Sequence, residues 1–122
     1  MVKTERRKHK RVEVSVLMDL FTAGRFSSLG RGCITNLSLG GMCIETPADF
    51  EPALVLDLRF PLAEDFFLDV LGEVVWKKAH HSVFAYGIKF TNMGFGMKRK
   101  LNKYIRVRLA ESASEGLEPR SY

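Results

Sequence analysis

Apolar and polar residues alternate in the first part of the chain, a pattern that predicts β-structure. Between Val12 and Phe21, valine, methionine and leucine alternate with glutamate, serine and aspartate. A period of two places one set of side chains in a core and the other in water, as in a half-buried strand. The stretch 22–25 predicts a turn, and a second strand is expected from about residue 26 or 30 to residue 35.

Four further short apolar segments follow, each bounded by residues that favour turns. Strands are expected at 42–45, ended by Pro47; at 54–60, stopped by Pro61; at 67–76; and at 83–90. Many short strands at this spacing are typical of an antiparallel barrel or sandwich. The pattern therefore predicts a mainly β domain with six strands.

The period changes near the C-terminus, where it predicts a helix. The apolar residues at i, i+4, i+7, i+8 and i+12 are Met97, Leu101, Tyr104, Ile105 and Leu109. They form one helical face, whereas Arg99, Lys103 and Arg106 lie off it and are expected to face water. Such an apolar face is expected to cover an open side or end of the barrel. After Ala110 the periodicity is lost, so 110–122 is expected to be a disordered tail.

Length and composition favour one domain in a reducing compartment. The 122 residues, 46% of them apolar, suffice for one core without a metal or disulfide. The chain has no apolar run of about 18 residues, and its N-terminal segment has no apolar core, so neither a transmembrane helix nor a secretory signal is expected. Cys33 and Cys43 lack metal-site spacing and are expected to be reduced thiols packed in the core of a cytoplasmic protein.

Charge is concentrated at two places. Residues 1–11 carry six basic groups and one acid, which gives +5, and residues 98–108 carry six basic groups and no acid. Residues 12–97 hold six basic and ten acidic groups, which gives −4. This distribution predicts a basic arm (1–11), a barrel with its helix (12–109) and an anionic partner such as a phosphate ligand, a nucleic acid or an acidic membrane.

Two short motifs are more specific than the charge. The arm contains RxxxR, formed by Arg7 and Arg11 and preceded by Arg6. A predicted turn between strands contains NxSxxG, formed by Asn36, Ser38 and Gly41. Asparagine and serine bond local backbone in turns, and glycine accepts positive φ.

The order of these motifs, the strands around them and the closing helix resemble the PilZ family of bacterial cyclic di-GMP receptors. The resemblance runs from Arg6 to about Leu109 and includes the segments Val74-Val75-Trp76 and 86–90. It implies a six-stranded antiparallel β-barrel of the split-barrel type with a C-terminal α-helix. It also implies cyclic di-GMP as the ligand, with no metal and no other cofactor.

The resemblance assigns roles to the motif residues. Arg7 and Arg11 are expected to bind phosphate and guanine, because the planar guanidinium pairs with phosphate oxygens and with guanine O6 and N7. Asn36 and Ser38 are expected to face guanine edges. Gly40 and Gly41 are expected to allow the turn and the close approach of a base. In the family, arginine at the position of Arg6 accompanies an intercalated ligand dimer, which favours two nucleotides per chain.

The arm is expected to be mobile without ligand and to close over the nucleotide. That closure would change the surface that a protein partner contacts in trans. No enzyme is expected, because the chain lacks HExxH, GxSxG, a Walker loop and paired acidic motifs.

Two alternatives remain open. One is a nucleic-acid-binding β-barrel that uses the arm and residues 98–108 against phosphates and exposes stacking aromatic residues. The other is a protein-interaction module with little nucleotide binding. The expectation that Trp76 and the phenylalanines are core residues weakens the first, and the intact motifs weaken the second. His80 and His81 are expected in a hairpin loop with no metal role.

Overall fold

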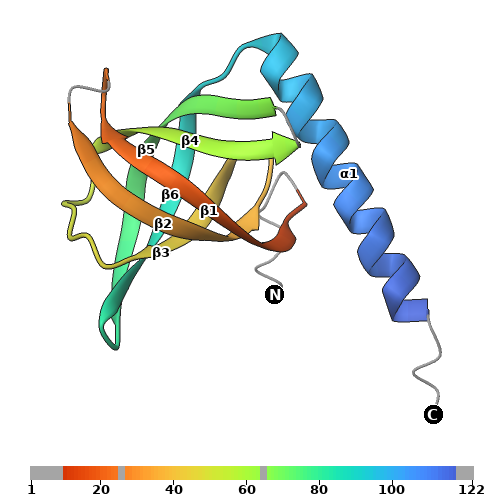
Figure 1. Ribbon diagram of the computed structural model, residues 1–122, viewed down its shortest axis with the longest axis horizontal. Coiled ribbons are helices and arrows are strands. Elements are labelled where there is room, and N and C mark those ends of the chain that lie inside the picture. The colour runs from red at the N-terminus through yellow and green to blue at the C-terminus, as the bar shows by residue number, and fades with distance from the viewer. Residues whose placement is uncertain (1–9, 25–26, 64–65, 118–122) are drawn as a thin grey trace, which may run out of the picture.

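Six antiparallel strands form a closed barrel, and one helix packs beside it (Figure 1). The computed structural model describes residues 10–24, 27–63 and 66–117. The elements are β1 (Val12–Thr22), β2 (Ser28–Leu37), β3 (Gly41–Thr46), β4 (Val55–Ala63), β5 (Phe66–His80), β6 (Val83–Asn92) and α1 (Phe95–Leu117). The strand order around the barrel is β1-β2-β3-β6-β5-β4. The predicted six-stranded barrel with a C-terminal helix is therefore confirmed.

The barrel interior holds the apolar phase of the alternating pattern. Leu20, Ile34 and Leu58 are fully buried, and they come from three different strands. The two cysteines are an exception to the expected core, because Cys33 and Cys43 are free thiols that are only half-buried. Each lies one position out of phase with its buried neighbours, so both side chains belong to the outer face of the barrel.

Strand β4 continues past Pro61, where the sequence predicted its end. The pairing between β1 and β4 covers only Asp19–Thr22 with Leu56–Arg59. Beyond Arg59, β4 has a paired neighbour only in β5, so the missing amide hydrogen of proline costs no bond to β1. Proline is tolerated in a strand at such a position.

Helix α1 lies against the barrel where β1 begins and β4 ends (Figure 1). Its predicted apolar face is buried there, with Leu101 fully covered and Ile105 4% exposed. The ammonium of Lys100 lies 4.2 Å from the ring centre of Phe66 at the start of β5. Val12 and Leu62 lie beyond the paired part of β1 and β4, yet both are buried. The helix therefore covers the open part of the barrel, as its apolar face predicted.

The helix is longer than predicted, because it continues to Leu117 through most of the expected disordered tail. Residues 110–115 read Ala-Glu-Ser-Ala-Ser-Glu and lack an apolar face, which is why periodicity missed them. Alanine and glutamate are nevertheless strong helix formers, and no glycine or proline interrupts the segment before residue 116. Intrinsic helix propensity favours this extension.

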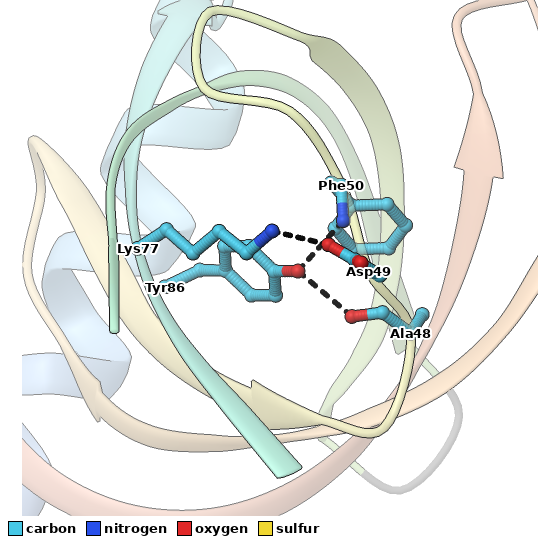
Figure 2. A network of polar contacts seen from close by, with 5 residues as sticks. All are labelled: Ala48, Asp49, Phe50, Lys77 and Tyr86. Atoms are coloured by element: carbon cyan, nitrogen blue, oxygen red, sulfur yellow. Dashed lines mark hydrogen bonds and ion pairs between the residues drawn. The ribbon is translucent and has the colours of Figure 1, made fainter. Parts of the chain in front are cut away.

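A polar network attaches the loop 47–54 to the hairpin of β5 and β6 (Figure 2). The hydroxyl of the buried Tyr86 donates to the carbonyl of Ala48 at 2.8 Å and accepts from the amide of Phe50 at 2.7 Å. Lys77 forms an ion pair with Asp49, and this hydrogen bond raises the pKa of Lys77 above 10.5. The network fixes the part of the hairpin that continues into the candidate site.

Candidate functional site

A pocket of about 210 Å³ opens on the outer face of the barrel across β3, β6 and β5. The β2–β3 turn and the residue before β1 complete its wall. The lining residues are Arg11, Ser38, Gly40, Gly41, Met42, Cys43, Val75, Trp76, Gly87, Ile88 and Lys89. The pocket therefore brings together one arginine of the arm motif and most of the NxSxxG turn.

Ser38 builds the turn with its own hydroxyl. Its Oγ accepts a hydrogen bond from the amide of Gly40 at 3.2 Å and donates to the carbonyl of Gly41 at 3.3 Å. The amide of Ser38 also donates to the Gly41 carbonyl, at 2.9 Å. Ser38 is only 8% exposed. The sequence is compatible with two roles for Ser38, a turn residue and a contact to a base. The hydrogen bonds observed are those of a turn residue.

Packing against β6 requires glycine at position 41, which the sequence pattern alone did not indicate. A Cβ atom at this position would overlap the carbonyl oxygen of Ile88 on β6. Next to it, the amide of Phe90 donates to the carbonyl of Gly40 at 2.9 Å. Gly41 thus lets the turn approach the backbone of β6, so the close contact observed at this glycine is with a strand.

Arg11 lies across β2 and β3. Its Nη1 is 3.5 Å from Oδ1 of Asn36 and 3.7 Å from Sγ of Cys43. A shift in register between Ile34 and Asn36 lets Asn36 pair with Cys43 on the outer face. The hydroxyl of Thr35, the extra residue in this bulge, donates to the Cys43 carbonyl at 3.3 Å. The bulge therefore directs the Asn36 amide toward Arg11.

Trp76 is the residue of the pocket that sequence analysis placed wrongly. Strict alternation gives it the same phase as the buried Val74, but a register shift lies between these two residues. Val75 and Trp76 are consequently both exposed, at 50% and 44%. A bulge re-aims side chains in this way, and bulges often lie next to functional sites. The expectation of a core tryptophan is therefore corrected.

The indole of Trp76 lies directly over Gly87, its partner in the β5–β6 pairing. A Cβ atom at Gly87 would overlap the five-membered ring of the indole. Glycine at position 87 thus lets an aromatic ring lie against the strand. The exposure of Trp76 and its pairing with Gly87 both follow from the register of β5 and β6, so the sequence pattern alone gives no signal for this aromatic surface.

The charge of the pocket is positive. Arg11 lies at one side, and Lys89, which pairs with Gly41 across β3 and β6, lies at another. Among the residues described, Lys89 has no ion pair, and no aspartate or glutamate lines the pocket. The same part of the chain holds no group of three side chains suited to a metal ion. Arginine, lysine, an amide and an indole together suit an anion that carries a planar base.

Arg6 and Arg7, the other arginines assigned by the sequence, lie outside the described residues. Of the predicted site residues, the structure brings Arg11 and Asn36 into contact, and it places Ser38, Gly40 and Gly41 in the pocket wall. Trp76 and Lys89 are additions that the sequence analysis did not make.

Comparison with known families identifies the class of protein. The model of the PilZ domain matches residues 5–106, which is most of the chain. The chain belongs to the PilZ family. No curated protein sequence is significantly similar to it.

Several solved structures share the fold. The PilZ domain of Escherichia coli YcgR with c-di-GMP is 16% identical to this chain and has a TM-score of 0.73. The match covers 93% of this chain and 98% of that one. The K. pneumonia MrkH–c-di-GMP complex is 15% identical, with a TM-score of 0.76 over 94% of this chain and 57% of that one. Bacillus subtilis MotI is 16% identical, with a TM-score of 0.74 over 87% of this chain and 52% of that one. The chain thus spans about half of the longer relatives.

No helix of the described residues has the length and hydropathy of a membrane span.

Proposed function

We propose that this protein is a cytoplasmic, non-enzymatic receptor for cyclic di-GMP. The observation that carries the proposal is the convergence of Arg11, the NxSxxG turn and Trp76 on one pocket with no acidic lining among the described residues. Family membership supports the choice of ligand, and the YcgR and MrkH structures named above hold this nucleotide.

Each side chain of the pocket suits one part of this ligand. The guanidinium of Arg11 matches a phosphate or the O6 and N7 edge of guanine. Trp76 offers a face on which guanine stacks, and Lys89 offers a point charge for a phosphodiester. In this proposal Asn36 contacts a base edge. Ser38, Gly40 and Gly41 hold the turn in place and contact the ligand from the wall of the pocket.

The size of the pocket supports a part for the arm. Its volume of about 210 Å³ is below the roughly 300–1,000 Å³ of sites for drug-sized ligands, and cyclic di-GMP carries two bases and two phosphates. The described residues therefore contact only part of the ligand. Arg6 and Arg7 complete the site in our proposal, with Arg6 favouring an intercalated pair of nucleotides.

Closure of the arm over the nucleotide would give the protein its output. The arm has a net charge of +5 in eleven residues, and bound nucleotide would neutralise part of this charge. A protein partner in trans that contacts this region would then meet a different surface in the two states. The chemistry of the partner does not follow from the pocket.

Calorimetric titration with cyclic di-GMP tests the proposal directly. Loss of one charged hydrogen-bonding arginine removes about 1.5–3 kcal/mol, so Arg7→Ala and Arg11→Ala should each weaken binding about tenfold or more. Lys10→Ala, which removes an adjacent exposed charge, is the matched control and should retain most of the affinity. A stoichiometry of two nucleotides per chain would support the role of Arg6 in binding an intercalated pair. A stoichiometry of one would contradict that role and leave the receptor function in place. No binding by the unmodified protein would contradict the receptor.

The exposure of Trp76 favours one second candidate, a nucleic-acid-binding barrel, because that function needs an aromatic residue on a strand face. Titration with a single-stranded oligonucleotide separates the two functions. Saturable oligonucleotide binding that depends on Trp76 and falls steeply with salt, together with no response to cyclic di-GMP, would establish this candidate instead.

A further inference from the structure

The side of α1 that faces away from the barrel carries a row of basic residues. Residues 98–108 contain six basic groups, but they are not equivalent in the structure. Lys100 lies over the ring of Phe66, and Arg108 is half-buried near the packed face. Lys98 is exposed but lies about 60° from Phe95, on the side away from Arg99. Arg99, Lys103 and Arg106 are exposed at i, i+4 and i+7, and none forms an ion pair with a described residue. These three cations therefore form one outward face.

An exposed aromatic residue belongs to the same face. Phe95, the first residue of α1, is 76% exposed and is the most exposed large apolar side chain of the described chain. At about 100° and 1.5 Å per residue, Phe95, Arg99, Lys103 and Arg106 lie within an arc of about 80° over about 17 Å. A single flat surface can thus contact all four side chains at once. We call these four residues the outer helix face.

The surroundings of this face contain little opposing charge. From residue 74 to residue 110 the sequence has nine basic residues and no acidic one. The apolar face of α1, with Leu101 and Ile105, is already buried against the barrel. Among the described residues of the helix, the exposed large apolar side chains are only Phe95 and Val107, which is 48% exposed. Binding through the outer face is therefore mainly electrostatic, with a shallow apolar contact.

We propose that the outer helix face docks on an anionic membrane surface. A bilayer with acidic lipids presents a plane of negative charge, which matches three cations and one aromatic ring aligned along one side of a helix. Phe95 would enter the headgroup region, where a phenylalanine is less costly than in water. This site is separate from the pocket on β3, β5 and β6 and does not depend on nucleotide binding.

Sedimentation with vesicles tests this docking. The protein should bind vesicles with about 30% phosphatidylglycerol and should not bind vesicles of phosphatidylcholine alone. Each basic residue near an anionic surface contributes about fivefold, so Arg99→Gln/Lys103→Gln/Arg106→Gln should weaken binding about 100-fold. Phe95→Ser should weaken it about tenfold. All four side chains are exposed, so circular dichroism and the melting temperature should stay unchanged.

A matched control removes the same number of charges from the arm. The Lys3→Gln/Lys8→Gln/Lys10→Gln variant keeps all motif arginines and has the same net charge, +2, as the helix variant (+5 less 3). It should retain binding within about tenfold. Equal weakening by both variants would show that net charge alone governs adsorption, and no binding of the unmodified protein to anionic vesicles would equally overturn the proposal. Binding of duplex DNA that requires the outer helix face, without vesicle binding, would assign the face to nucleic acid instead.

Discussion

Among single residues, Trp76 would determine how a planar ligand meets the barrel in the proposed receptor. Its indole is held against Gly87 on one side and is open to the pocket on the other. A ring fixed in this way loses little conformational freedom when a base stacks on it. In the proposed receptor, Trp76 would thus add affinity without adding a hydrogen bond that selects one base.

The chain contains one tryptophan, so its fluorescence reports on this position alone. We expect cyclic di-GMP to quench the emission in a saturable way, because guanine stacks on the indole in our proposal. Trp76→Leu should weaken calorimetric binding by about 1–3 kcal/mol, since stacking of one base contributes that much. Phe67→Leu makes the same aromatic-to-leucine change at an exposed position of β5 outside the pocket and should leave the affinity unchanged. Full affinity in the Trp76→Leu variant would show that no base lies on the indole.

The polar residues that the structure places at the pocket were easier to find from the sequence than its tryptophan. RxxxR and NxSxxG are contiguous motifs, so they can be read without knowledge of the fold. Trp76 depends on a bulge between Val74 and Trp76, and a bulge changes the phase of a strand without a distinct residue pattern. Lys89 reaches the pocket through the pairing of β3 with β6, which alternation alone does not define.

The elements that support the site can be tested through Tyr86. Its hydroxyl serves both the carbonyl of Ala48 and the amide of Phe50, so Tyr86→Phe leaves a buried amide without its partner (Figure 2). Such a loss costs about 1–3 kcal/mol. Urea denaturation should show this decrease in the free energy of unfolding.

Tyr104→Phe is the control for this prediction. Tyr104 is half-buried on α1, and its hydroxyl has no hydrogen bond with any residue that the structure describes. Its substitution should therefore change the stability by less than about 0.5 kcal/mol. Equal effects of the two substitutions would mean that the loop 47–54 is not held by the Tyr86 hydroxyl.

The elements themselves were largely predictable from hydrophobic period, and their ends were not. The alternation around Val12–Phe21 marks β1 almost to its observed end. Pro61 falsely marked the end of β4, because the cost of a proline depends on which neighbour each strand has at that point. The last turns of α1 lack an apolar face, so only propensity indicated them.

For the molecule as a whole, ligand binding should be coupled to ordering of the arm. Ordering about six residues costs about 1–2 kcal/mol each, and each charged hydrogen bond returns about 1.5–3 kcal/mol. Several arginine contacts are therefore needed, and they should slow hydrogen exchange between Arg6 and Arg11 when cyclic di-GMP is saturating. Amides of β6, which lie in the barrel in both states, serve as the internal reference. Exchange in the arm that is equally fast with and without ligand would contradict closure.

The short paired region between β1 and β4 has a consequence for solubility. The strands pair through only four residues of each, and α1 covers the remainder (Figure 1). Without the helix, the first half of β1 and the last residues of β4 would present free backbone groups beside an apolar interior, and such edges recruit strands from other molecules. A chain cut before Phe95 would therefore aggregate. By covering these strand edges, α1 also prevents intermolecular β-sheet formation.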